Sequence, residues 1–430
     1  MKIVTIGGGS GQHSILTGLT NRARSHDELE QNNISAIVST FDTGGHTGIL
    51  MEARIPKDEK GRFLPAGDIR QCLAAMANNE HAKKSFQYRI KEGDNKGAVV
   101  GNILLDAGYE QHGDDFEQSI ELVKKILDVK GNVIPCTLTR AEFHGVLENG
   151  YSVKGEEELI SKAVWFNSQI KEVSLEPENV KANPKAIKAI LEADKIVLSQ
   201  GSLFTSLIPN LSVKEICDAV KKSSAKKIYV MNIVTQRGET DGFTAKKHLE
   251  VLERYLGPNV IDYIIIHKGE LPSKLKIKYE LEGQKRVVDD LGESERVIRK
   301  ELIAKDSPVL RHDPDKLAEV ILGLYWVKFK YLKSDNSCLG DIMVKVMKRR
   351  GKIVAFSAAK IKKGVYNSAK DAKLPVSARK KLVRKVAMPV IRSMRGKKLV
   401  KSSAIRKSIL SKLNRMSKAA AQAWRKYERR

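Results

Sequence analysis

The chain has 430 residues, enough for two or three domains with separate hydrophobic cores. Its formal net charge of +26 comes entirely from residues 341–430, which hold 29 Lys and Arg against 3 Asp and Glu, whereas residues 1–340 hold 48 of each kind. No apolar run approaches the roughly 20 residues that cross a bilayer, and the four cysteines show neither a CxxC pair nor zinc-ligand spacing, which excludes a membrane-spanning protein and a zinc scaffold.

The cysteines and the N-terminal residues together predict the compartment. Met1-Lys2 leads directly into an apolar strand-like run, without the apolar stretch and small-residue cleavage site of a signal peptide. Cysteines that lie far apart in sequence are typical of a reducing setting. We therefore expect a cytoplasmic protein.

Short apolar runs and helical periodicity alternate through the first half of the chain. Strands are predicted at Lys2–Ile6, Ala36–Phe41, Asn132–Thr137 and Lys195–Leu198, and helices at Asp68–Ala77 and Asp115–Leu127. This alternation is the βαβ rhythm of a parallel sheet. The predicted fold class is therefore α/β, with a doubly wound Rossmann-like sheet.

Residues 140–175 show a different pattern. Two alternating segments flank Glu148-Asn149-Gly150, and Asn-Gly is a strong hairpin signal. We expect a small antiparallel insertion at about 140–175, forming a side wall of the ligand crevice. The α/β pattern then resumes and closes with a helix at 315–325, so the first domain is predicted to span 1–330. A polar linker, 331–341, precedes a separate, mainly helical module at 342–430.

The predicted strands Lys2–Ile6 and Ala36–Phe41, and a further strand predicted from the apolar run Ile228–Met231, end in loops rich in glycine and hydrogen-bonding side chains. The loops are Gly7–Gly11, Asp42–Gly48 and Asn232–Thr244. Because the carboxyl ends of parallel strands meet at one edge of a sheet, these loops predict a single crevice. The first loop aims backbone amides and a helix N-terminus at negative charge, which is typical of a phosphate cradle. A tight turn without a ligand is the alternative.

Six motifs in fixed order make residues 1 to about 325 resemble the CofD/YvcK family. They are the three loops above together with Leu64–Leu73, Gly101-Asn102 and Gly201–Leu211. The chain is more similar to the YvcK branch, the gluconeogenesis factors, which bind nucleotide sugars such as UDP-sugars or dinucleotides such as NAD and regulate carbon flux and envelope synthesis. The other branch, CofD, is a 2-phospho-L-lactate transferase that moves a phospholactyl group from a guanosine diphosphate donor to a deazaflavin.

The resemblance implies a set of site residues. It places Asp42 and Asp68 in the crevice, where two carboxylates would hold Mg²⁺ or orient a hydroxyl for attack. Asp68 has a structural alternative, because it could cap the helix that follows. The nucleotide ligand would lie against Gly8, Gly9, Ser10, Gly11, Asn102, Gly201, Ser202, Asn232, Thr235, Gln236, Glu239 and Asp241.

Two departures from the family pattern bear on catalysis. Ala98 stands where the G-H-S-x-G-N motif has its histidine, and Thr43 replaces a second acidic residue. Both disfavour efficient phospholactyl transfer, whereas the loop Thr235–Thr244 favours a YvcK-like regulatory binding protein. A Mg²⁺-dependent transferase is the alternative. The sequence does not determine the oligomeric state.

The basic module opens with Val346–Phe356, which resembles the start of an ATP-cone, a small regulatory nucleotide-binding domain. That resemblance implies ATP binding at Lys348, Arg349 and Lys360. The surplus of positive charge exceeds what one ATP neutralises, so nucleic acid or another polyanion is a rival partner. A basic helical tail without a ligand is the third alternative.

Overall fold

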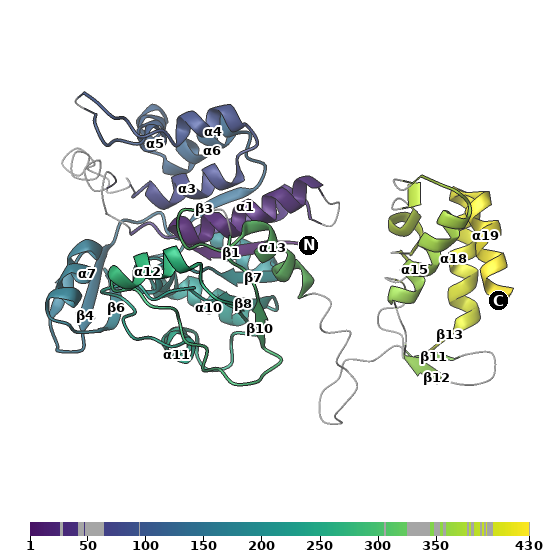
Figure 1. Cartoon of the computed structure of the whole chain (residues 1–430). Coiled ribbons are helices and arrows are strands. Elements are labelled where there is room, and N and C mark those ends of the chain that lie inside the picture. The colour runs from purple at the N-terminus through teal and green to yellow at the C-terminus, as the bar shows by residue number, and fades with distance from the viewer. Residues whose placement is uncertain are drawn as a thin grey trace. The chain divides into compact units, whose positions relative to one another are not determined.

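The computed structural model describes residues 1–25, 29–41, 47, 64–93, 95–304 and 307–324 of the first 330 residues. Beyond them it describes residues 345–347, 353–355, 358–375, 378–379, 382–387, 389–390, 393 and 399–429. The chain divides into two compact units, Met1–Lys330 and Tyr331–Arg430 (Figure 1). No helix among these residues is long and apolar enough to cross a membrane.

A parallel sheet of seven strands forms the centre of the first unit, in the order β10-β9-β8-β7-β1-β2-β3. The strands are β1 Ile3–Gly7, β2 Ile34–Val38, β3 Asn132–Pro135, β7 Lys195–Leu198, β8 Lys226–Val230, β9 Tyr263–His267 and β10 Val297–Lys300. The order reverses between β1 and β7, which makes this pair the switch point of a doubly wound sheet. The prediction of an α/β fold with a parallel sheet is confirmed.

Both faces of the sheet are covered by helices. Ile3 of β1 belongs to one core cluster and Ile6 to the other, because successive strand residues point to opposite faces. The core on one face includes residues of α1 Gly9–Ser25, α3 Gly67–Met76, α4 Glu80–Phe86, α5 Val100–Gln111, α6 Phe116–Leu127 and α13 Pro314–Gly323. The other packs against η3 Leu203–Leu207, α9 Ile208–Ser212, α8 Pro184–Glu192, α10 Lys214–Lys222 and α11 Ala245–Leu256. Figure 1 shows α1 and α3 above the sheet and α10 and α11 below it.

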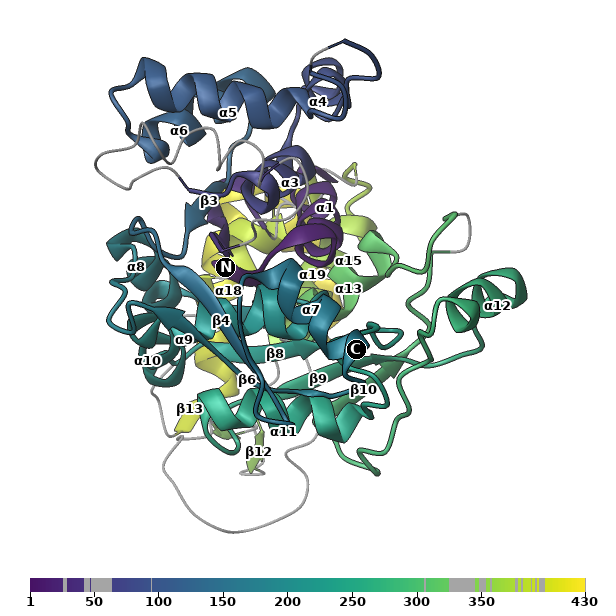
Figure 2. The same ribbon diagram turned by 90° about the vertical axis from the view of Figure 1, so that its left-hand side faces the viewer.

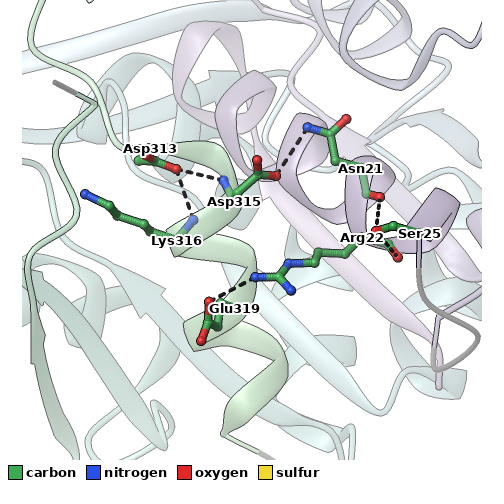
Figure 3. A network of polar contacts seen from close by, with 7 residues as sticks. All are labelled: Asn21, Arg22, Ser25, Asp313, Asp315, Lys316 and Glu319. Atoms are coloured by element: carbon green, nitrogen blue, oxygen red, sulfur yellow. Dashed lines mark hydrogen bonds and ion pairs between the residues drawn. The ribbon is translucent and has the colours of Figure 1, made fainter. Parts of the chain in front are cut away.

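Helix α1 is held along its side by α13, as Figure 3 shows. Arg22 forms an ion pair of 2.9 Å with Glu319, and Asn21 donates to Asp315 at 3.3 Å. Asp313 caps α13 by accepting from the backbone amides of residues 315 and 316, both at 3.0 Å. These contacts fix α1, whose N-terminus follows the first glycine loop.

The predicted antiparallel insertion is confirmed. Strands β4 Glu142–Leu147, β5 Ser152–Lys154 and β6 Ile170–Glu176 form an antiparallel sheet of order β5-β4-β6. Figure 2 shows β4 and β6 side by side, with α7 Glu156–Trp165 close to them. At the turn, Asn149 Oδ1 accepts from the amide of Tyr151 at 3.0 Å, and Gly150 has a φ of +84°. The Asn-Gly signal therefore marks the hairpin correctly.

Three shorter or outlying elements complete the list of helices in the described part of the first unit. They are η1 Gln31–Asn33 before β2, α7 of the insertion, and α12 Ser273–Leu281, which has no buried residue. The helix predicted at Asp68–Ala77 is α3, and its N-cap position is Ala66. Asp68 therefore lies inside the first turn, and the alternative that it caps this helix is wrong.

The second unit has its own small mixed sheet and helices. Strands β11 Lys345–Met347, β12 Ile353–Ala355 and β13 Leu399–Lys401 lie in the order β12-β11-β13, and the helical elements are α15 Ala358–Asp371, η4 Val383–Ala387, α18 Ser402–Met416 and α19 Lys418–Arg429. Its core includes Val386, Val390, Ile405, Ile409 and Leu413. The helical spacing of these residues in the sequence reflects this buried face.

Candidate functional site

Two glycine loops meet at the switch point of the sheet. Gly11 lies in the first turn of α1, and a Cβ atom there would lie 1.7 Å from the carbonyl oxygen of Gln200 in the loop after β7. The Gln200 side chain donates back to the carbonyl of Gly11 at 3.0 Å. Only glycine permits this approach, so the structure brings together two loops that the sequence analysis assigned to the nucleotide ligand.

Asp68 lies directly against the first loop. Its side chain is 3% exposed, and a Cβ atom at Gly8 would lie 2.0 Å from its Oδ2. A carboxylate at this place repels a phosphate unless a cation lies between them. Mg²⁺ uses one or two protein carboxylates together with phosphate oxygens, so the residues described here fit this ion. Asp42, the second predicted ligand, lies outside the described residues.

The N-terminus of α1 supplies the groups that a phosphate needs. Helix α1 begins at Gly9, and the first amides of a helix have no acceptor within it. Their partial positive charge attracts anions. The buried Gln12 side chain holds this turn rigidly, because its Nε2 donates to Thr5 Oγ1 at 2.8 Å and to the carbonyl of Ile37 at 3.2 Å.

The polar groups of the second glycine loop, which follows β7, form hydrogen bonds with other groups of the protein. Asn232 accepts from the amide of Gly201 at 3.0 Å and donates to its carbonyl at 2.7 Å. Ser202 Oγ donates to Glu239 at 2.6 Å and accepts from the amide of Thr205 at 2.9 Å. The Ser202 hydroxyl, which the sequence assigned to an anion, is therefore engaged within the chain, as is the Gly201 amide.

Glu239 is a buried carboxyl at the centre of this arrangement. Burial raises its pKa above the usual range, and the hydrogen bonds from Ser202 and from the amide of Phe204 oppose that shift. The charge of Asp241 acts in the same direction as burial and raises the pKa further. Through its hydrogen bonds to Ser202 and the Phe204 amide, Glu239 orders the second loop.

The remaining predicted residues of 232–244 build the loop on which they lie. Thr235 Oγ1 accepts from the amide of Lys285 at 3.0 Å. Gln236 donates its amide to Thr240 Oγ1 at 2.8 Å, and its side chain accepts from Asn232 at 3.2 Å. Asp241 accepts from the amide of Gly238 at 2.5 Å. These bonds fix the position of residues 236–241.

A cavity of about 320 Å³ lies between this loop and the antiparallel insertion. It is lined by Ala163, Val164, Asn167, Ser168, Gln169, Arg237, Gly238, Glu239 and Asp241. The insertion and the loop that holds Glu239 therefore line this cavity together. Several neighbouring amide, hydroxyl and charged groups suit a hydroxyl-rich ligand.

A cationic cluster near the first turns of α1 was not apparent from the sequence. The pKa of His13 falls to about 4, first because of burial and then because of the charges of Lys83, Arg311 and Arg70. Arg70 Nε is buried without a hydrogen-bond partner among the described residues. These cations lie in three separate segments, so only the fold brings them to one place.

Gly101, the residue before Asn102, lies against Arg70. A Cβ atom on the neighbouring Gly101 would lie 2.9 Å from Cδ of Arg70, and Asn102 is 3% exposed. Its Oδ1 is buried with no hydrogen-bond partner in the described part of the chain. The predicted site residue is thus a buried polar group next to a glycine that packs on Arg70, whereas Ala98 and Val99 before it are buried and carry no titratable group.

A second cavity of about 320 Å³ lies at the opposite, amino ends of β1 and β2. Three lysines and three glutamates line it, and two ion pairs form among them, Lys185–Glu117 at 3.0 Å and Lys2–Glu192 at 2.5 Å. Balanced charges of this kind leave no surplus for an anion. The place where the two glycine loops meet is therefore the better candidate.

The predicted ATP site in the second unit lies mostly outside the described residues. Lys348 and Arg349 fall in the segment between β11 and β12, which pair antiparallel with Met347 opposite Ile353. Lys360 lies in the first turn of α15. The geometry of these three side chains is not part of the described structure.

Comparisons with known proteins agree on the first unit. The family model described as 2-phospho-L-lactate transferase CofD matches residues 3–307. A gluconeogenesis factor of Bacillus subtilis (strain 168) is 36% identical over 330 residues, covering 75% of this chain and 98% of the relative. One of Halalkalibacterium halodurans is 36% identical over 327 residues, covering 74% and 95%. A crystal structure of a UPF0052 family member from Bacillus halodurans has a TM-score of 0.66 at 34% identity, covering 75% of this chain and 99% of that one.

Proposed function

The chain belongs to the CofD family, alongside the gluconeogenesis factors, and we propose that its first unit binds a compound with a nucleoside diphosphate and acts as a regulatory protein. The ligand class is a nucleotide sugar, such as a UDP-sugar, or a dinucleotide, such as NAD. One observation carries this proposal, namely the meeting of two glycine loops at the switch point, where doubly wound sheets bind nucleotides.

We assign each part of the ligand to a different group of residues. The diphosphate lies on Gly8–Gly11, facing the α1 amides, with Arg70 as a nearby cation. Asp68 holds Mg²⁺, which when bound neutralises the repulsion between carboxylate and phosphate. The hydroxyl-rich part of the ligand occupies the cavity beside Arg237 and Asp241. Asn232 and Glu239 act behind these groups by fixing the second loop.

Calorimetry with purified protein tests the proposal. We expect UDP-sugars or NAD to bind in the presence of Mg²⁺, and the corresponding nucleoside without phosphates to bind far more weakly. Asp68→Asn preserves the shape of the side chain and should lower the affinity with Mg²⁺ while leaving thermal unfolding nearly unchanged. Absence of binding by UDP-sugars, NAD and GDP derivatives at millimolar concentration would refute the proposal.

Phospholactyl transfer is the second candidate, favoured by the buried Asp68 carboxylate at the first glycine loop. A transferase of this kind needs a group that accepts a proton from the attacking hydroxyl. Ala98, at the position of the family's histidine, offers none. We therefore expect no transfer when the protein is incubated with Mg²⁺, a guanosine diphosphate donor and a deazaflavin, and turnover detected by mass spectrometry would replace the regulatory proposal.

For the second unit we propose binding of a polyanion, either a nucleoside triphosphate or nucleic acid. Its support is the excess of 29 basic over 3 acidic residues on a unit that has its own buried core. Lys401, Lys407 and Arg415 of β13 and α18 are exposed. A folded basic surface attracts phosphates without needing a deep pocket.

A further inference from the structure

Three metal-ligand side chains lie together on the outer face of the antiparallel insertion. Glu142 and His144 are two residues apart on β4, so they point to the same face, while Phe143 between them is buried. The strand register places Glu176 of β6 directly opposite Glu142. The three residues thus come from two neighbouring strands.

The distances suit a small cation. His144 Nε2 lies 2.8 Å from an oxygen of Glu176 and 3.9 Å from an oxygen of Glu142, and one ligand atom of each residue lies within 4.8 Å of the others. Ligands of a tetrahedral zinc ion at bonds of about 2.1 Å are separated by about 3.4 Å. Small side-chain rotations are enough to reach that spacing.

His144 Nε2 has an unused ligand position. The atom is buried, and its close approach to Glu176 lacks the geometry of a hydrogen bond, so it has no such partner among the described residues. The His144 side chain as a whole is 19% exposed, whereas the two carboxylates are about 60% exposed. An ion from solution can therefore reach the cluster without unfolding the sheet.

The positive charge between the two glutamates is at present supplied by a lysine. Lys154 of β5 stands opposite His144 in the register, and its Nζ lies 3.4 Å from an oxygen of each glutamate. Its side chain is 66% exposed, so it can swing into solvent at little cost. A divalent ion with three ligands interacts more favourably with the two carboxylates than the single exposed charge of Lys154 does.

We propose that Glu142, His144 and Glu176 form a binding site for a divalent transition-metal ion of the zinc class, with Lys154 as a displaceable competitor. One imidazole nitrogen and two carboxylate oxygens suit zinc or cobalt, whereas magnesium and calcium prefer oxygen ligands alone. A bound ion joins β4 to β6 and so stiffens the insertion, whose helix α7 leads into the lining of the cavity at Val164.

The test is Zn²⁺ titration of the full-length protein without an affinity tag, in competition with a chromogenic chelator. We expect one site that His144→Ala weakens at least about tenfold. The control is His81→Ala, which removes an exposed histidine on α4 and should leave the affinity unchanged. Magnesium in excess should not displace the zinc.

A gain-of-affinity variant guards against loss through misfolding. Lys154→Met removes the competing ammonium group and should tighten Zn²⁺ binding several-fold. The proposal is overturned if His144→Ala binds Zn²⁺ as tightly as His81→Ala does, or if Lys154→Met binds no more tightly than the natural protein. In either case the cluster is an exposed network of ion pairs only.

Discussion

The two units of this chain present opposite solutions to anion binding. Residues 1–340 carry equal numbers of basic and acidic side chains, and the proposed site depends on a shaped crevice with backbone amides and a few placed cations. The second unit carries a large surplus of lysine and arginine on a small folded core. A shaped site discriminates among ligands, whereas a surplus of charge attracts any polyanion and loses strength in salt.

The salt dependence of binding should separate the two units most clearly. We expect affinity of the full chain for duplex DNA to fall about a thousandfold or more between 50 and 200 mM salt, if six or more phosphates are contacted. A chain ending at residue 330 should not bind DNA at low salt. ATP should compete with DNA, and Lys348→Ala should weaken ATP selectively. DNA binding that is insensitive to salt, or that survives the truncation, contradicts this division.

A side chain that forces the two glycine loops apart should damage the proposed nucleotide site. Gly11→Ala places a methyl group 1.7 Å from the Gln200 carbonyl, and we expect a loss of about 3 kcal/mol in the free energy of unfolding together with loss of nucleotide binding. Urea unfolding measures the first and calorimetry the second. The matched control is Gly323→Ala in α13, where no atom lies within 4 Å and stability should hold or rise. Equal behaviour of the two variants would show that the loops are not in contact.

Removing the Asn232 side chain should have a smaller effect. Asn232→Ala leaves the amide and carbonyl of Gly201 without their partner, and a buried unsatisfied group costs about 2 kcal/mol. Affinity for the nucleotide should fall less than in Gly11→Ala, because Asn232 acts through the second loop. An affinity that falls with no change in urea unfolding would instead indicate that Asn232 contacts the ligand directly.

The smallest expected effect is a change in pH dependence. The pKa of Glu239 is raised in the folded protein by burial, so its charged form costs stability, and that cost grows as pH rises from the unfolded value of about 4.3 through the folded one. Glu239→Gln keeps acceptors for Ser202 and the Phe204 amide. The variant should therefore gain stability over the natural protein at pH 8 and lose that advantage near pH 4. A difference that is constant with pH would show that Glu239 does not titrate abnormally.

The sequence predicted the elements but not the contacts between them. The strand predicted at Lys2–Ile6 and the Asn149-Gly150 turn carry local signals of strand and hairpin, and the structure has β1 at Ile3–Gly7 and the hairpin at that turn. The strand at Lys195–Leu198 was also predicted, but not that Lys195 is buried with its Nζ bonded to the carbonyls of α13. Such a role depends on a partner 126 residues away, which periodicity does not report.

The candidate site also contains residues that motifs predict and contacts that only the structure shows. Gly8, Gly11 and Asp68 were predicted from motifs and do lie together. Gly201 and Ser202 were assigned to the ligand because their types suit anions, yet their polar groups bond to Asn232 and Glu239. Residue type indicates what a group can bind, and only the tertiary structure decides whether the protein itself uses that capacity.

A crystal structure of the protein with Mg²⁺ and NAD or a UDP-sugar tests the central claim most directly. We predict the diphosphate at the N-terminus of α1, over Gly8–Gly11, with Mg²⁺ between a phosphate oxygen and Asp68. The sugar or second nucleoside should lie in the cavity beside Arg237. A diphosphate bound elsewhere, or a ligand in this crevice whose phosphates do not reach the α1 amides, would contradict the account.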